Sequence, residues 1–176
     1  MPCSIGMTIS DNNTPSFDFD ISLFYFSGEF IINSKLTGIG ITWIPLNYKY
    51  IQNNHYLNLV NFQIYWNIFE ILRLNKEINN NTFFAGSIFG PFASINCALN
   101  LSIPRIPEFK DYIFSAGLRY TFTGRPLEGA VRRYFFNLEC GYRNISGQNS
   151  FYMSMGIDIY YVMDYLFYYL KTLGEK

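Results

Sequence analysis

Charged side chains are scarce in this chain, at 15% of its 176 residues, against about 25% in ordinary soluble proteins. The 13 Lys and Arg balance the 13 Asp and Glu, and no basic run occurs. This pattern excludes a typical nucleic-acid-binding protein, which gathers positive charge on one face. Uninterrupted apolar runs of about 18 residues are also missing, so we expect no membrane-spanning helix.

Residues that usually carry chemistry are few. The three cysteines, Cys3, Cys97 and Cys140, have no CxxC spacing, so they predict neither a disulfide framework nor a zinc site. His55 is the single histidine, and no recognisable motif ties a nucleophile to it. The glutamates are scattered and have no metal-ligand spacing. We therefore predict no catalytic residue, no metal, no cofactor and no enzymatic activity.

The first segment, residues 1–15, is polar and turn-rich towards its end, and we expect it to be flexible. It contains no basic region followed by an apolar run, so it is not a secretory signal. Three alternatives remain open: an intracellular chain, a signal that has been removed, or a gene start upstream of Met1.

What the chain does contain is aromatic residues, at 20%, and regular alternation. In Tyr112–Phe122 every second residue is large and apolar, and the residues between them are mostly small or polar. A period of two over eleven residues predicts a β-strand with two unlike faces. The minor face holds Ser115, Gly117, Arg119 and Thr121, side chains that suit a narrow, crowded space.

The same alternation recurs along the chain and predicts at least seven strands. They lie within Phe17–Phe26, Thr37–Leu46, Tyr56–Leu72, Phe83–Ile103, Tyr112–Phe122, Tyr134–Arg143 and Ser150–Tyr161. An eighth is hidden in Phe17–Ile32, in Phe83–Ile103 or in the aromatic tail after Val162, which also fits a short amphipathic helix. Asn47–His55 is expected to be a polar loop.

No helical segment separates these strands, so a parallel sheet is not expected. The predicted fold is all-β, an antiparallel up-and-down β-barrel of about eight strands, which leaves no open sheet edge. We expect residues 1–15 to be a flexible segment, 16–170 to form one barrel domain, and 171–176 to be a tail.

Parity alone does not say which face of the strands looks inward. A soluble lipocalin-like barrel would turn the apolar face into the lumen to bind an apolar ligand, whereas a membrane barrel turns it outward. The minor face is rich in Gly, Ser, Thr and Asn and poor in Lys and Glu, which fits the packed lumen of about eight strands better than bulk water. The large apolar residues extend over about nine to eleven positions, enough for a tilted strand to cross a bilayer. We therefore favour the transmembrane type.

Tyrosine and tryptophan concentrate towards the ends of the predicted strands. Amphipathic rings at such positions suit a membrane–water interface. The predicted interfacial aromatics are Trp43, Tyr48, Tyr56, Tyr112, Tyr120, Tyr142 and Tyr152. The simpler alternative is that tyrosine is merely common here, with 15 copies.

The core of the most regular strand, Ala116–Phe122, resembles a strand of small bacterial outer-membrane β-barrel proteins, and the pattern extends over about residues 17–161. This is a resemblance to a class and not to the motif of one family. It implies a bacterial outer-membrane location, contact with the lipid bilayer, and a structural, adhesive or narrow, porin-like role. Recognition of a protein or host ligand would then fall to the loops, in a monomeric barrel.

Charged residues on the minor face are the remaining candidates. They are Asp18, Asp20, Arg119, Glu139, Arg143 and Asp158. If the last three strands are neighbours, Arg119, Glu139 and Asp158 share one face and would attract each other in a low-dielectric lumen. The network could line a polar path or, as we favour, plug and rigidify the barrel. We expect Glu139→Ala to destabilise the barrel without opening a conductive channel.

Overall fold

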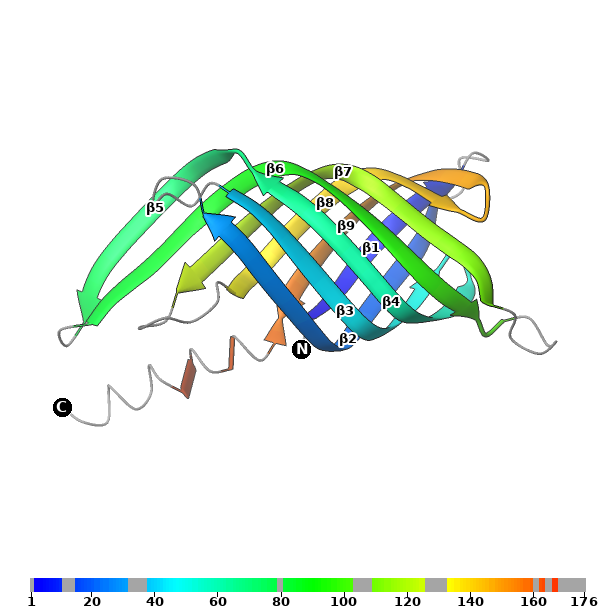
Figure 1. Cartoon of the computed structure of the whole chain (residues 1–176), viewed down its shortest axis with the longest axis horizontal. Coiled ribbons are helices and arrows are strands. Elements are labelled where there is room, and N and C mark those ends of the chain that lie inside the picture. The colour runs from blue at the N-terminus through cyan, green and yellow to red at the C-terminus, as the bar shows by residue number, and fades with distance from the viewer. Residues whose placement is uncertain are drawn as a thin grey trace.

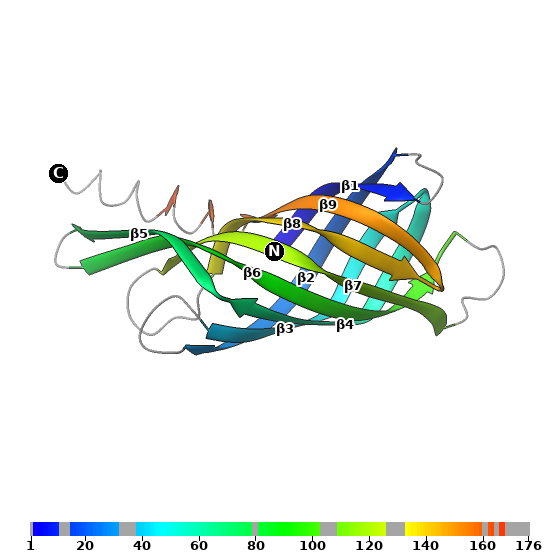
Figure 2. The same ribbon diagram turned by 90° about the horizontal axis from the view of Figure 1, so that it is seen from above.

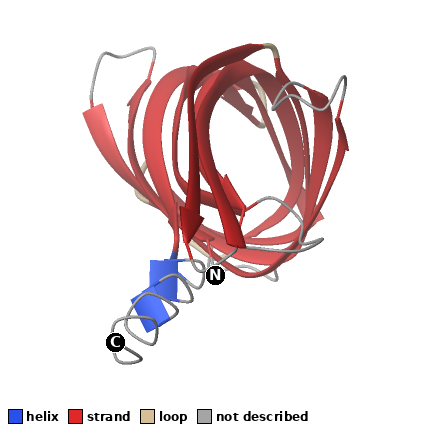
Figure 3. Ribbon diagram, turned by 90° about the vertical axis from the view of Figure 1, so that its left-hand side faces the viewer, coloured by secondary structure: helices blue, strands red, loops and turns tan. Residues whose placement is uncertain are grey.

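The chain folds into a closed antiparallel β-barrel in the computed structural model, which describes residues 2–10, 15–31, 38–78, 81–102, 109–125, 133–159, 162–163 and 166–167. Successive strands pair in an up-and-down order, β9 pairs back onto β1, and β4 pairs with β6, so that eight strands surround the lumen (Figures 1 and 3). The strands are β1 Pro2–Ser10, β2 Pro15–Ile31, β3 Gly38–Ile51, β4 Asn54–Asn67, β5 Phe69–Ile78, β6 Asn81–Asn100, β7 Phe109–Arg125, β8 Arg133–Ile145 and β9 Gln148–Asp158.

The ninth strand, β5, is the continuation of β4 beyond the ring. Strand β6 pairs with β4 through Phe92 and the residues after it, and with β5 through Phe89 and the residues before it. Gly90 lies at this handover, where a Cβ atom would stand 1.7 Å from the carbonyl oxygen of Trp66. The close backbone approach therefore requires glycine. The β5–β6 hairpin reaches out beyond the ring in Figures 1 and 2.

The two ends of the barrel differ. We call one the hairpin end, because it carries the two-residue turns Gln52–Asn53 and Ser146–Gly147. All four turn residues have positive φ, between 48° and 94°, as tight hairpins that follow the strand twist require. The predicted loop Asn47–His55 is therefore wrong, since β3 and β4 continue through it and turn on two residues. Strand β1 begins and β9 ends at the opposite, terminal end.

The first segment also differs from the prediction of a flexible region. Residues 2–10 form β1, which pairs with β2 on one edge and with β9 on the other. This is the eighth strand of the ring, which the sequence placed elsewhere. Polar or small residues alternate with larger apolar ones along β1, but the residues on its inner face, Ser4, Gly6 and Thr8, have very small side chains. The sequence of this segment therefore resembles that of a polar, flexible region. Pairing along both edges holds it in place.

The tail after β9 is helical where it is described, at Ile159, 162–163 and 166–167; residues 171–176, the predicted tail, lie outside the described residues. Across the described parts of the chain, no helix is both long and apolar enough to span a membrane.

An irregular band crosses β2, β3 and β4. The pairing of β2 with β3 shifts between Ser22 and Phe26, and that of β4 with β6 shifts between Asn58 and Val60. Pro45 falls in a break in the β3–β4 register, where it does not have to donate a hydrogen bond. Because each such irregularity reverses the alternation, the faces of β3 and β4 invert on either side of the band.

Candidate functional site

The outer surface of the barrel is apolar. Large hydrophobic side chains between 38% and 57% exposed form what we call the outer belt: Ile5, Met7, Phe17, Ile39, Ile41, Trp43, Val60, Phe62, Ile64, Trp66, Ile95, Phe114, Leu118, Leu138, Met153, Met155 and Ile157. Every member of the belt is uncharged. Across β2, β3 and β4 the rings of Phe26, Trp43 and Phe62 stack at centroid distances of 5.5 and 6.4 Å. The alternation therefore places the apolar face of the strands outward.

Five of the seven predicted interfacial aromatics lie on the outer face. Tyr112 and Tyr142 are exposed near the hairpin end, and Trp43 is exposed on β3. Tyr48 on β3 and Tyr120 on β7 are half-buried on the same outer face. Tyr48 also pairs its hydroxyl with Nδ1 of His55.

The other two predictions of this group, Tyr56 and Tyr152, are wrong. Tyr56 is 4% exposed and packs inside the barrel, because the irregularity between Asn58 and Val60 reverses the alternation of β4. Tyr152 is 2% exposed, and its ring lies 4.1 Å from the guanidinium carbon of Arg143. Its position on the minor face of β9 directs it into the lumen.

The inner surface is polar and buried. Most of the buried polar side chains belong to it: Thr8, Asp18, Ser22, Thr42, Asn47, Asn58, Asn61, Asn67, Asn96, Ser115, Arg119, Thr121, Thr123, Asn137, Arg143, Ser150 and Asp158, each at most 9% exposed. Some of its contacts join strands that are not neighbours in the ring, which places them across the lumen. Buried polar groups of this kind are costly unless they are hydrogen-bonded to one another.

One ion pair across the lumen joins β8 to β2. Nη1 of Arg143 lies 2.6 Å from Oδ2 of Asp18 and also donates to the Thr8 hydroxyl over 3.2 Å. That hydroxyl in turn donates to Asp18. The guanidinium stacks on the ring of Tyr152, a cation–π arrangement. All four groups are buried, and β1, β2, β8 and β9 supply one each.

A second group joins β7, β8 and β4. Nε of Arg119 lies 3.7 Å from Oε1 of Glu139, and its Nη1 donates to Gln63 over 2.9 Å. The same carboxylate oxygen accepts hydrogen bonds from Gln63 at 3.3 Å and Asn137 at 3.1 Å. Arg119 also lies over the ring of Tyr65, 5.0 Å from its centroid. Arg119 and Glu139 share the inner face of the neighbouring strands β7 and β8, and the register makes them direct partners, which the alternation alone does not predict.

Asp20 and Asp158 belong to neither group. Asp20 pairs with Nζ of Lys49 at 3.0 Å and accepts two hydrogen bonds from Asn47. Asp158 is fully buried at the end of β9, where it pairs with Pro2 of β1. The residue of β9 that pairs with Glu139 is Ser154, so Asp158 lies further along the strand. The structure thus gathers the six predicted charges in the lumen but distributes them over separate groups.

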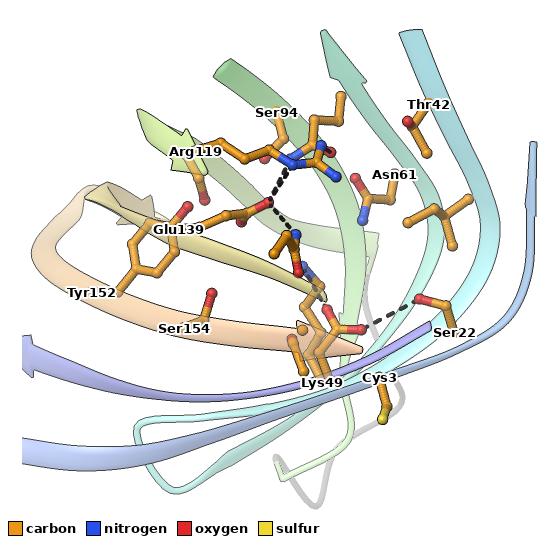
Figure 4. Close-up of a pocket in the computed structure, with 17 residues that line it drawn as sticks. Cys3, Ser22, Thr42, Lys49, Asn61, Ser94, Arg119, Glu139, Tyr152 and Ser154 are labelled. Atoms are coloured by element: carbon orange, nitrogen blue, oxygen red, sulfur yellow. Dashed lines mark hydrogen bonds and ion pairs between the residues drawn. The ribbon is translucent and has the colours of Figure 1, made fainter. Parts of the chain in front are cut away.

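A cavity of about 90 Å³ lies between the second group and the Asp20–Lys49 pair. Figure 4 shows Arg119, Glu139, Asn61, Lys49 and Tyr152 around it, with Arg119 and Glu139 joined to each other. Hydroxyl and amide groups from all eight ring strands complete its wall. Such a volume has room for several water molecules. The positive side chains in its wall, Lys49 and Arg119, are balanced by the negative side chains of Asp20 and Glu139. The wall of the cavity is therefore polar without a net charge.

The alternation does not predict several of these residues. Lys49 and Asn47 lie within the expected loop Asn47–His55, and Tyr65 lies on the minor face of its strand among polar residues. A glycine opposite Tyr65 is the sequence feature that points to it. Gly40 is the register partner of Tyr65, and a Cβ atom on Gly40 would lie 2.1 Å from Cζ of the Tyr65 ring. Among the described residues, no group of three or more His, Cys, Asp or Glu side chains is arranged to hold a metal ion.

In comparisons with known proteins, no family model, no curated protein and no solved structure matches the chain significantly.

Proposed function

We propose that this chain is an integral β-barrel of a bacterial outer membrane, with a structural or adhesive role and any recognition carried by its loops. The observation that carries the proposal is the inverted distribution of side chains. Large apolar groups form the outer belt, while Arg119, Arg143, Asp18 and Asp158 are buried in the lumen. A soluble protein gains most of its stability from the opposite arrangement.

The outer belt supports contact with acyl chains. Soluble monomers rarely expose contiguous apolar patches of more than a few hundred Å². Here uncharged large side chains occupy the outer face of successive strands around the ring, as in Ile64 on β4, Ile95 on β6, Phe114 on β7 and Met153 on β9. A closed barrel also pairs the backbone groups of its ring strands, which any segment in hydrocarbon must do.

The lumen supports this function over that of a lipocalin-like carrier. A barrel that holds an apolar ligand needs an apolar interior, with a few polar groups to orient the ligand. This interior carries ion pairs and asparagines, and its cavity is lined by Ser, Thr, Asn, Lys, Arg and Glu side chains. An apolar ligand would have to displace the hydrogen bonds of these groups.

The cross-lumen contacts support a structural role more than a wide pore. Arg143, Asp18, Tyr152, Arg119 and Gln63 meet across the barrel, so side chains fill much of its width. Barrels of about eight strands leave little more than the space for their own side chains. The barrel is therefore a rigid membrane anchor that holds its loops in place.

The test is purification in detergent followed by electrophoresis with and without heating. A membrane barrel resists unfolding by the denaturing detergent until it is boiled, so the unheated protein migrates as a faster, compact band. We expect this heat-modifiable shift, and aggregation when detergent is removed. A chain that stays soluble and monomeric without detergent, at one mobility, would contradict the proposal.

A matched pair of variants localises the effect. Leu118 faces outward in the belt and Thr121 faces the lumen three residues later on β7. We expect Leu118→Asp to abolish recovery of the heat-modifiable band in membranes. We expect Thr121→Ser, which keeps a lumen hydroxyl, to leave the band unchanged.

A further inference from the structure

The methionines of the outer belt lie together on one wall of the barrel. Met7 is 44% exposed on β1, and Met153 and Met155 are 54% and 49% exposed on β9. These two strands pair where the ring closes, and they run side by side in Figures 1 and 2. The other members of the belt are Ile, Val, Leu, Phe and Trp side chains, so the belt has its thioether groups at this one place. We call the three residues the methionine patch.

The strand register makes the patch continuous. Met7 and Met153 are direct partners across the antiparallel pair, and Met155 lies two residues further along β9 on the same face. Side chains directly opposite each other have Cβ atoms about 4.5–5.5 Å apart, and diagonal neighbours such as Met7 and Met155 are within reach of long side chains. The three flexible, polarizable thioethers therefore form one reactive surface on the outside of the barrel.

A thioether keeps its chemistry in apolar surroundings. Methionine is oxidised to its sulfoxide without first losing a proton, whereas a cysteine thiol reacts as its thiolate. Hydrocarbon disfavours the charged form of any ionisable group, so it suppresses the reactions of a thiol and leaves those of a thioether unchanged. The patch thus presents a nucleophile that can react where the belt places it.

The surroundings of the patch select its oxidant. In the proposed membrane barrel the patch faces acyl chains, and a small polar oxidant such as hydrogen peroxide stays mainly in the water. A hydroperoxide carried on an acyl chain is confined to the same layer as the patch, which raises its effective concentration there. The aliphatic side chains of the belt do not accept an oxygen atom from it, whereas the thioethers do.

We propose that the methionine patch is an oxidative modification site that reduces acyl hydroperoxides of the surrounding bilayer. The inference rests on the proposed membrane function. The thioether sulfur attacks the terminal oxygen of the hydroperoxide, so that the O–O bond breaks and an S–O bond forms. The proton of that oxygen passes to the alkoxide oxygen. The sulfur loses two electrons, the peroxide gains them, and the products are one methionine sulfoxide and one acyl alcohol.

Proteoliposomes that contain a phospholipid hydroperoxide test the patch. Peptide mass spectrometry locates the oxygen gained by each methionine, and lipid analysis measures the hydroperoxide and the alcohol. We expect Met7, Met153 and Met155 each to gain one oxygen atom, with one alcohol formed for every sulfoxide. Replacing all three with leucine, which conserves volume and apolar character, should abolish the protein-dependent loss of hydroperoxide. Ile64→Leu, an apolar exchange on β4, is the matched control and should leave that loss unchanged.

Met163 is the internal reference for location. It is 45% exposed, but it lies on the helical tail beyond the end of β9. Hydrogen peroxide added to the water should oxidise Met163 before the patch, and the acyl hydroperoxide should reverse this order. The same order of oxidation with both oxidants would overturn the inference, because access through the acyl chains would then not distinguish the patch.

The remaining outcomes separate this inference from the proposed function. Each variant is first tested for the heat-modifiable band, which reports folding and insertion independently of oxidation. If the triple leucine variant does not fold, Met153→Leu takes its place and should lower the oxygen uptake of the patch by one atom per barrel. An inserted wild type whose patch stays unoxidised overturns the inference, as does an equal loss of hydroperoxide with the leucine variant. Failure of the wild type to insert contradicts the proposed function instead.

Discussion

The outer belt and the lumen use opposite chemistry on the two faces of the same strands. On β7, Phe114 and Leu118 are about half exposed while Ser115 and Arg119, one position further, are buried. In the belt no specific partner is needed, because dispersion and exclusion from water act on any apolar group. In the lumen every polar atom needs a partner, so identity and position matter.

This difference implies unequal tolerance to substitution. A belt residue can be exchanged for another of similar apolar character, since its surroundings adapt. A lumen residue such as Arg143 contacts Asp18, Thr8 and Tyr152 on three other strands, so its loss leaves several buried groups without a partner. We therefore expect the greatest loss of stability where a buried lumen charge loses its partner, and the least where one apolar belt residue replaces another.

The largest loss is expected for Asp18→Ala, which leaves the Arg143 guanidinium buried without its carboxylate. Removing one partner of a buried pair costs about 3–5 kcal/mol. The measurement is the free energy of unfolding by urea in detergent micelles. The double variant Asp18→Ala with Arg143→Met, which removes both charges, should recover part of this loss. An additive double variant would show that the pair is not coupled.

A charge in the belt ranks next. Ile64→Lys places a cation on the outer face of β4, where Ile64 is 51% exposed. At a bilayer midplane such a change costs about 2–4 kcal/mol, and near the interface about 0–1 kcal/mol. Tyr142→Lys, near the hairpin end, is therefore the matched control. Unfolding titrations in lipid vesicles measure both. Equal stability of the two variants would argue against a depth-dependent apolar environment.

How far the sequence predicts the structure depends on which wall of the barrel is considered. In β7, β8 and β9 the alternation runs through the core of each strand without a break, and the residues that share a face in the sequence do so in the barrel. That Arg119 and Glu139 share the inner face follows from it. In β2, β3 and β4 the irregular band reverses the faces, so the alternation predicts an outward Tyr56 where the structure has an inward one, and it does not predict Lys49 in the lumen.

The inner partners are less predictable than the faces. Alternation tells which residues point inward, but not the stagger of the strands around the ring. That stagger decides that Arg143 meets Asp18 and that Asp20 meets Lys49. The sequence does not predict strand β1, for a different reason. Its small residues carry little hydrophobic signal, and only pairing with both neighbours fixes it.

A smaller loss is expected for Glu139→Ala. Its carboxylate accepts hydrogen bonds from Gln63 and Asn137 and lies beside Arg119, but 15% of the side chain is exposed to the cavity. Water there can replace part of what is lost, so we expect about 1.5–3 kcal/mol, the range for hydrogen bonds to charged groups. Conductance should not change. A loss as large as that of Asp18→Ala would mean that the cavity is dry.

The smallest effect is expected within the belt, for Phe62→Leu. It removes one ring from the stack with Trp43 and keeps an apolar side chain. Aromatic pairs contribute about 0.5–1.5 kcal/mol beyond their buried area. Urea titration is the measurement, with Ile64→Leu as the control that changes shape without removing a ring. A loss above that of Glu139→Ala would reverse the expected order of belt and lumen.

In the proposed membrane barrel the outer belt contacts acyl chains. Trp43 and Trp66 are the two tryptophans of the chain, and both lie in the belt, at 42% and 51% exposure. The most direct measurement is their fluorescence in vesicles whose lipids carry bromine on the acyl chains. Contact with hydrocarbon predicts strong quenching by these lipids and little quenching by acrylamide in the water. Emission unaffected by brominated lipids and quenched by acrylamide would contradict the claim.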